Sequence, residues 1–271
     1  MTWFGFARGQ FLLSWRVFWR NRRTMFIGFV LPLGLAALIA SPLKEKEIGG
    51  VSAAAYVSVG FMGFAMVTSF IALLNGLVTR RDDLVLKRFR TTAVPASAVL
   101  AGQIAAQAAA LLVQVGLLAV LMVTRFDAPA PADPLLLVAA LLVGYLTFAL
   151  LAVALSGITP GAESAPFVAL PVLLLSMFGA AVFQPLSGLP EWAMRLLHAL
   201  PLGPVIEVLR TAWFGRDFTT GSEVWGTVGL PETSWASGWT SAAGPLLVVL
   251  AWAAAATAVS RRWFRWEPRR A

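Results

Sequence analysis

The chain has 271 residues, of which 59% are hydrophobic and 13% are charged, whereas a soluble domain carries about 25% charged residues. This composition excludes an ordinary soluble domain and predicts an integral membrane protein. Because the sequence has no cysteine and a single histidine, disulfide frameworks and Cys/His metal sites are excluded.

Residues 1–23 are expected to form an amphipathic helix that lies in the membrane interface. Aromatic residues recur at helical spacing on one stripe, and arginines recur at the same spacing on another. The residues assigned to the two stripes are Phe11, Trp15, Arg16, Phe18, Trp19 and Arg20. The alternative is a simple cluster of positive charge that fixes the orientation of the span that follows it.

Residues 24–260 are expected to form a six-span transmembrane domain, because each crossing of a bilayer needs about 20 apolar residues. The uncharged runs are 24–42, 48–78, 96–124, 135–157, 165–186 and 241–260. The first run could belong to a cleaved signal sequence, but its charged lead-in is long and further spans follow. The second run exceeds one crossing, and Gly60 and Gly63 mark the expected place of a kink.

Lysine and arginine are unevenly distributed along the chain. Segments 1–23, 79–95 and 261–271 hold five each of the 21 basic residues. Since positive residues stay in the cytoplasm, both termini are predicted to be cytoplasmic, with residues 261–271 as a basic tail. The net charge of +8 then reflects membrane topology and gives no reason to expect a nucleic-acid partner.

The charged segment 79–95, TRRDDLVLKRFRTTAVP, separates the second and third runs and is expected to contain a short cytoplasmic helix. Acidic residues at its beginning and basic residues at its end match a helix dipole, and Leu86 and Phe89 provide an apolar edge. Positive charge alone could serve only topology, but the apolar edge favours docking on a partner protein. The residues assigned to this contact are Arg81, Asp82, Asp83, Leu86, Lys87, Arg88, Phe89 and Arg90.

Several uncharged polar residues lie within the predicted spans. On the third span Gln103, Gln107 and Gln114 fall within roughly 40° of one another on the helix surface. Hydrogen bonding between helices is the favoured interpretation of this stripe, and substrate contact is the alternative. The set that could line a path or join helices is Thr68, Ser69, Asn75, Gln103, Gln107, Ser176 and Gln184. No charged residue lies in the runs, which argues against proton or sodium coupling and for an apolar or amphipathic substrate.

The outer region, residues 187–240, is predicted to contain two short, partly re-entrant helices between the fifth and sixth spans. Its notable polar and aromatic residues are Trp192, His198, Glu207 and Arg210. Glu207 and Arg210 are spaced to pair on one helix, and His198 is expected to pack or hydrogen-bond there.

Two segments resemble those of the ABC-2 type transporter permeases. TRRDDLVLKRFRTTAVPASAVLAGQ, residues 79–103, is similar to the cytoplasmic loop of that family, and LSGLPEWAMRLLHALPLGPVIEVLRTAWFG, residues 186–215, is similar to its segment after the fifth span. The daunorubicin-type drug-efflux permeases look most similar. The resemblance implies an all-α membrane protein in which loop 79–95 is a coupling helix that sits on a nucleotide-binding subunit.

The function implied by this resemblance is that of the permease subunit of an ATP-driven ABC exporter for a hydrophobic or amphipathic, drug- or antibiotic-like compound. Export of a lipid-linked glycan or glycolipid is the alternative within the family, and a stand-alone channel or membrane scaffold is the alternative from another class. The sequence lacks a G-x-x-x-x-G-K-[ST] phosphate loop, so it is not expected to be an enzyme or to carry a cofactor. ATP and Mg²⁺ are expected on two copies of a separate ATPase, joined to a homodimer of this chain in a bacterial plasma membrane.

Overall fold

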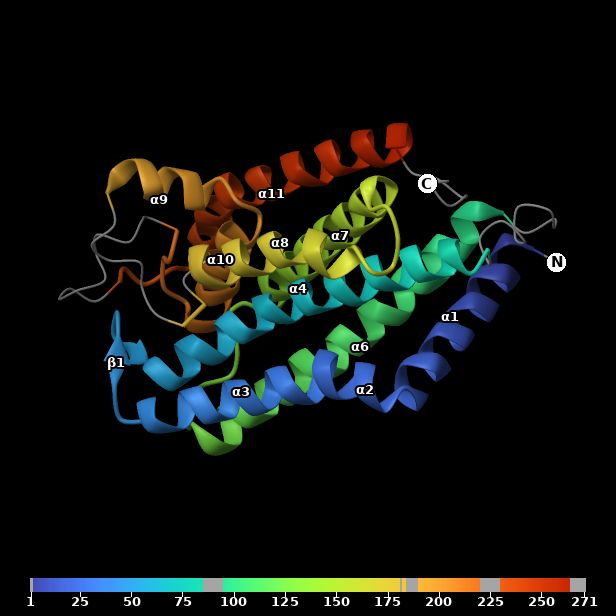
Figure 1. Ribbon diagram of the computed structural model, residues 1–271. Helices are drawn as coiled ribbons and strands as arrows, with labels where there is room; N and C mark the ends of the chain where they lie inside the picture. The colour runs from blue at the N-terminus through green and yellow to red at the C-terminus, as the bar shows by residue number, and fades with distance from the viewer. Residues whose placement is uncertain (1, 85–94, 181, 184–189, 220–229, 264–271) are drawn as a thin grey trace.

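The computed structural model describes residues 2–84, 95–180, 182–183, 190–219 and 230–263. These residues form a bundle of helices (Figure 1), which agrees with the predicted all-α class. The only sheet in the described ranges is the antiparallel pair β1 (Glu47–Ile48) and β2 (Val51–Ser52). The helices of ten or more residues are α1 (Trp3–Arg20), α3 (Leu31–Ala40), α4 (Ala53–Asp82), α6 (Ala96–Arg125), α7 (Pro134–Ile158), α8 (Ala165–Gly179), α10 (Leu202–Phe214) and α11 (Trp235–Trp263).

Four of the described helices are long and apolar enough to cross a membrane: α4, α6, α7 and α11. Shorter apolar helices occupy Gly28–Leu43 and Ala165–Gly179, where the first and fifth spans were predicted. The second of these, α8, ends at Gly179, seven residues before the predicted end of the fifth span. Its 15 residues extend about 22 Å at 1.5 Å per residue, which is less than a bilayer core of roughly 30 Å.

The region of the first predicted span is made of consecutive short pieces rather than one helix. They are α2 (Arg22–Met25), the π-helix η1 (Phe26–Val30), α3 and the 3₁₀-helix η2 (Ser41–Leu43). Pro32 has no N–H to donate to the carbonyl of Gly28, four residues earlier, and its ring would clash with that carbonyl in a regular helix. The wider π-turn accommodates this proline, and its Leu31 N–H bonds the carbonyl of Phe26, five residues back.

Helix α4 runs through the centre of the bundle and contacts α3, α6, α7, α8 and α10 (Figure 1). Its first turn is capped by the Ser52 hydroxyl, which accepts from the Ala55 N–H. The helix is continuous from Ala53 to Asp82, so no break occurs at the two glycines where a kink was expected. It also extends into segment 79–95, so Asp82 and Asp83 end the spanning helix instead of beginning a separate one.

The two glycines of α4 instead allow neighbouring segments to approach closely, the segment after α8 at Gly60 and helix α10 at Gly63. A Cβ on Gly60 would collide with the Val182 carbonyl, and a Cβ on Gly63 would collide with the Ile206 side chain. Small residues let helix backbones approach one another in this way. Helix α10, one of the two short helices predicted to be partly re-entrant, is buried in the bundle against α4, α7 and α11.

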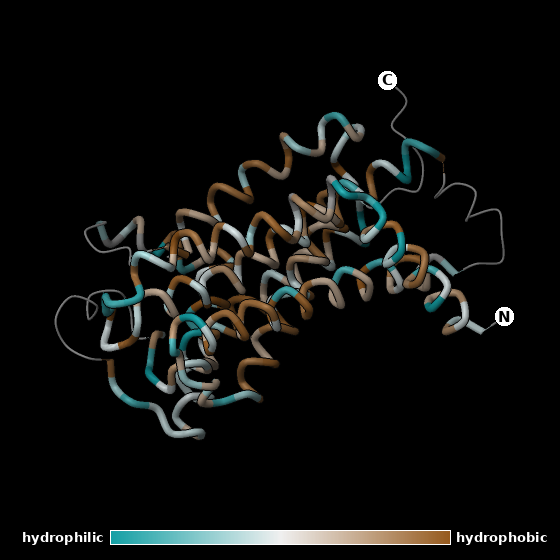
Figure 2. The backbone as a smooth tube through the Cα atoms, turned by 90° about the horizontal axis from the view of Figure 1, so that it is seen from below, coloured by the Kyte–Doolittle hydropathy of each residue, from teal (hydrophilic) through white to brown (hydrophobic). Residues whose placement is uncertain are grey.

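Polar and apolar residues are separated along the length of the molecule. The middle of the bundle is mainly apolar, and polar residues gather at its two ends (Figure 2). The beginning of α1 and the end of α11 lie at the same end of the bundle (Figure 1). This arrangement suits a body that crosses a bilayer with polar ends in water.

Candidate functional site

The cytoplasmic end predicted from the sequence is the end where α4 stops, α6 begins and the turn between α7 and α8 lies. Three consecutive residues near the end of α4, Arg80, Arg81 and Asp82, bind neighbouring elements, and we call them the α4 end cluster. Arg81 is the central member, because only 2% of its surface is exposed. Its guanidinium therefore bonds to groups within the protein and not to solvent.

Arg81 binds the end of helix α7. Its guanidinium donates to the carbonyls of Ser156 at 2.7 Å, Thr159 at 2.6 Å and Pro160 at 3.1 Å. The Ser156 carbonyl would normally accept from the N–H of residue 160, but that residue is a proline. Arg81 thus supplies a missing donor at a helix C-terminus, where the helix dipole also favours a positive charge.

Asp82 holds the other side of the same turn. Its carboxylate accepts a hydrogen bond from the Ala162 N–H at 2.6 Å, shortly before α8 begins. The neighbouring Asp83 is exposed and contributes its backbone N–H to the Thr79 carbonyl. After it, Leu84 adopts a left-handed backbone conformation with φ of 59°, which ends the helix. The end of α4 and the α7–α8 turn are consequently tied together on both sides.

Helix α1 attaches to the same end of the bundle. Arg80 donates to the Ser14 hydroxyl at 3.1 Å, and the Trp3 indole donates to the Ser97 hydroxyl at the start of α6 at 2.9 Å. A Cβ on Gly102 would collide with the backbone of α1, so the two helices cross very closely. Helix α1 is therefore in direct contact with both α6 and the end of α4.

The aromatic stripe predicted for α1 faces the protein in part. Phe18 is buried and packs edge-on against Phe29 of η1, and Trp19 contacts the same ring. Phe11 and Trp15 are half-buried and stacked with ring centres 6.1 Å apart, while Arg16 and Arg20 are exposed. The expected separation of aromatic residues from arginines is present, but part of the aromatic side is covered by η1 and α6.

The remaining residues assigned to the coupling contact lie outside the described residues. These are Leu86, Lys87, Arg88, Phe89 and Arg90. Only Arg81, Asp82 and Asp83 of that set have described positions, and the contact of the set with a partner stays a prediction.

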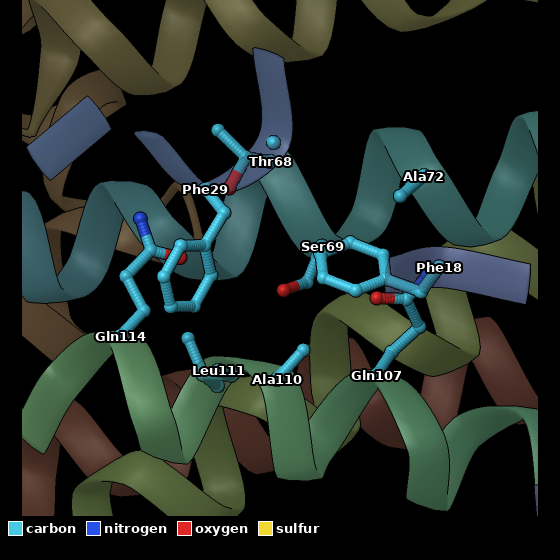
Figure 3. Close-up of a pocket in the computed structure, with 10 residues that line it drawn as sticks. Phe18, Phe29, Thr68, Ser69, Ala72, Gln107, Ala110, Leu111 and Gln114 are labelled. Atoms are coloured by element: carbon cyan, nitrogen blue, oxygen red, sulfur yellow. The ribbon is translucent and has the colours of Figure 1, made fainter. Parts of the chain in front are cut away.

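A second candidate site is a small pocket between α1, η1, α4 and α6 (Figure 3). The residues that line it are Phe18, Gly28, Phe29, Thr68, Ser69, Ala72, Gln107, Ala110, Leu111 and Gln114. The rings of Phe18 and Phe29 flank the space, with hydroxyls from α4 on one wall and amides from α6 on the facing wall (Figure 3). The pocket has room for about one water molecule.

The pocket brings together some of the polar residues predicted for a substrate path and leaves others apart. Thr68, Ser69 and Gln107 line it, together with Gln114, whose place on the same stripe was predicted from its spacing. The buried Gln103 lies one turn away against Gly76, and Asn75 is half-buried outside the lining. Ser176 is buried on α8, and Gln184 lies outside the described residues.

Hydrogen bonding between helices was the favoured interpretation of the glutamine stripe, but two of its amide atoms have no such partner in the described part of the chain. The Gln103 amide oxygen and the Gln114 amide nitrogen are buried and form no hydrogen bond with any residue whose position is described. A hydrogen bond between helices does occur nearby, from the Tyr145 hydroxyl of α7 to the Ile104 carbonyl of α6 at 2.6 Å. The sequence offered no means of pairing these two residues.

The polar residues of the outer helices contact one another and neighbouring elements, and His198 forms a hydrogen bond there as predicted. His198 of α9 (Glu191–His198) is paired with the Glu207 carboxylate, with 2.8 Å between nitrogen and oxygen. This hydrogen bond raises the pKa of the imidazole above its ordinary value. Arg210 is fully buried, lies 3.4 Å above the ring of Tyr56 and donates to the Val182 carbonyl, whereas Trp192 is largely exposed.

A comparison with protein families identifies a match over most of the chain. A family model described as ABC-2 type transporter matches residues 11–214, which run from the middle of α1 to the end of α10. A comparison with curated proteins found no match.

Proposed function

The chain belongs to the ABC-2 type transporter family, and from this premise we propose that it is the membrane subunit of an ATP-driven exporter for a hydrophobic or amphipathic compound. The observation that carries the proposal is the family match over residues 11–214. The charge-free spans predicted from the sequence support an apolar substrate, since ionisable residues at membrane depth would be expected for a proton-coupled carrier.

ATP hydrolysis belongs to a partner in this proposal. The sequence has no phosphate-binding loop, so we assign ATP and Mg²⁺ to a separate ATPase subunit. Two copies of that subunit and two copies of this chain would make the complete exporter. Among the family's substrate classes we favour drug- or antibiotic-like compounds, as in the daunorubicin-type permeases.

The α4 end cluster is the proposed point at which ATPase movement enters the membrane domain. It lies within segment 79–95, which the sequence assigns to the ATPase contact. Arg81 and Asp82 bind both sides of the α7–α8 turn, so a displacement of the end of α4 reaches α7 and α8 without a flexible connection. Rigid-body movement of this kind is a common means of transmitting a conformational change.

The proposed location is a bacterial plasma membrane, with six spans and both termini in the cytoplasm. The shared end of the bundle where α1 begins and α11 stops supports the placement of both termini on one side. Exposed arginines on α1 suit contact with anionic headgroups. Because the chain has no cysteine, Gly9→Cys should react with a membrane-impermeant maleimide only from inside, and Asp127→Cys only from outside. Labelling of both positions from one side would contradict this topology.

The transport assay uses inverted membrane vesicles that contain the chain and an ABC ATPase subunit that co-purifies with it. ATP should drive uptake of a fluorescent hydrophobic dye, and uptake should cease when the ATPase phosphate-loop lysine is replaced. A channel would instead give ATP-independent flux, and a scaffold would give none. Either result would refute the proposal.

Two adjacent aspartates provide a matched pair for the coupling step. Asp82→Asn removes a charge-assisted bond to the α7–α8 turn, whereas Asp83→Asn removes the same charge at an exposed position. We expect Asp82→Asn to lower dye uptake per ATP hydrolysed while Asp83→Asn leaves this ratio unchanged, with membrane insertion normal in both. If dye uptake per ATP hydrolysed were equal in the two variants, Asp82 would have no role in coupling.

A further inference from the structure

The walls of the pocket between η1, α4 and α6 carry hydrogen-bonding groups but no charge. Hydroxyls come from Thr68 and Ser69, and amides come from Gln107 and Gln114. The Thr68 hydroxyl donates to the Ala65 carbonyl at 2.9 Å, so towards the pocket it can act only as an acceptor. A charged group would find no opposite charge among the lining residues, and burying it there would be unfavourable.

Gln114, a residue of the pocket wall, has unused hydrogen-bonding capacity. Its exposed fraction is 2%, and its amide nitrogen makes no hydrogen bond with any described part of the chain. A buried amide donor without an acceptor is costly, and proteins satisfy nearly all such groups. An oxygen atom that accepts a hydrogen bond would therefore satisfy the amide nitrogen of Gln114.

Gly28 of the π-helix η1 forms part of the pocket wall. A Cβ added at Gly28 would meet no atom within 4 Å, although the neighbouring Phe29 is buried. The π-turn that accommodates Pro32 thus has open space at a glycine of the pocket wall, and we take this position as the entrance. Local π-turns of this type are frequent at functional sites.

The size of the pocket restricts which part of a ligand can enter. Room for about one water molecule admits a single hydroxyl or carbonyl group and excludes a larger head. The rest of such a molecule would extend past Gly28, alongside the rings of Phe18 and Phe29, whose centres are 6.5 Å apart. An apolar chain or ring would pack favourably against these two aromatic side chains.

We propose that this pocket binds the hydroxyl or carbonyl group of an uncharged amphipathic molecule that enters from the bilayer past Gly28, with Gln114 donating a hydrogen bond to its oxygen. The inference rests on the proposed function, because it makes the pocket a binding site for the class of compound that is exported. It also specifies that class as uncharged and oxygen-bearing.

The test compares two photoreactive probes that differ only in a hydroxyl group. A 16-carbon alcohol carrying a diazirine near its hydroxyl end and the matching alkane are added to the purified chain in lipid nanodiscs without an ATPase. We expect the alcohol to label residues of η1, α4 and α6 at the pocket, and unlabelled hexadecanol to displace it. The alkane should label lipid-facing positions such as the exposed Leu117 and Val120 of α6.

Three variants locate the binding. Gln114→Leu should raise the hexadecanol concentration needed for half-displacement by about threefold to tenfold, as expected for one lost hydrogen bond. Gly28→Leu should abolish pocket labelling by filling the opening, where no atom stands in its way. Gln103→Leu is the matched control, because it makes the same change on the same helix outside the lining and should leave displacement unchanged.

Two results would overturn the inference. The alkane could label the pocket as strongly as the alcohol, which would make it a lipid-accessible packing defect. Alternatively, Gln114→Leu and Gln103→Leu could behave alike, which would make the pocket at most a site for a bound water. The labelling assay needs neither ATP nor transport, so the two proposals can fail separately. Absence of pocket labelling together with normal ATP-driven dye uptake would refute only the proposed binding site. Pocket labelling without ATP-driven uptake refutes the exporter proposal alone.

Discussion

Replacing Arg81 with methionine is expected to destabilise the protein, because three carbonyls at the end of α7 lose their donor. A buried carbonyl left unsatisfied costs about 1–3 kcal/mol. The Ser156 carbonyl bears the full cost, since the proline at position 160 cannot replace the lost bond. The carbonyls of Thr159 and Pro160 belong to the turn, where water can partly compensate.

The combined loss is about 2–4 kcal/mol in the free energy of unfolding, counting one fully and two partly unsatisfied carbonyls. For a chain of this size, each kcal/mol lowers the melting temperature by roughly 2–4 °C, so the expected decrease is roughly 4–16 °C. The melting temperature is measured by fluorescence-detected size-exclusion chromatography in detergent. Arg80→Met is the control, because Arg80 donates to the single half-buried hydroxyl of Ser14 and should cost about 1 kcal/mol or less. Equal melting temperatures for the two variants would refute the role assigned to Arg81.

Two further predictions concern the outer helices and the core. Glu207 raises the pKa of His198, so the pair stabilises the fold fully below the ordinary histidine pKa of about 6.5, and this contribution is lost as the pH rises through the raised pKa. The melting temperature should accordingly fall over this range, and His198→Gln should flatten that part of the curve; an unchanged curve would contradict the pairing. Gly63→Ala should cost about 1–3 kcal/mol in unfolding free energy because its methyl group meets the side chain of α10, whereas Gly34→Ala, which meets nothing within 4 Å, should be neutral or stabilising. Equal effects of the two alanine variants in a thermal melt would show that α10 does not pack as described.

The bounds of some helices could be predicted closely from the sequence. The run 135–157 corresponds to α7 at Pro134–Ile158, and the run 96–124 corresponds to α6 at Ala96–Arg125. Prolines and charged residues border both runs, so hydropathy and local termination signals agree. Where an apolar run continues past the end of a helix, as it does after Gly179, hydropathy no longer distinguishes helix from other structure.

The tertiary contacts of the candidate sites could be predicted only in part. Helical spacing placed Gln107 and Gln114 on one face, but no local signal indicated that Ser69 of α4 lies opposite them. The charge of Arg81 suggested a solvent-facing contact, whereas its guanidinium is buried against the end of α7. Pro160 was the available clue, because a proline just after an apolar helix leaves a carbonyl that another segment must satisfy.

The bond between Arg81 and the end of α7 also bears on how the chain is assembled in the membrane. Helix α4 precedes α7 and α8 in the chain, so the ribosome releases Arg81 before Ser156 and Pro160. When the α7–α8 hairpin reaches the bilayer, the donor that completes the end of α7 is already at the membrane surface. Insertion of the later hairpin is thus guided by the earlier helix, and a substitution at Arg81 is expected to delay biogenesis as well as to weaken the finished fold.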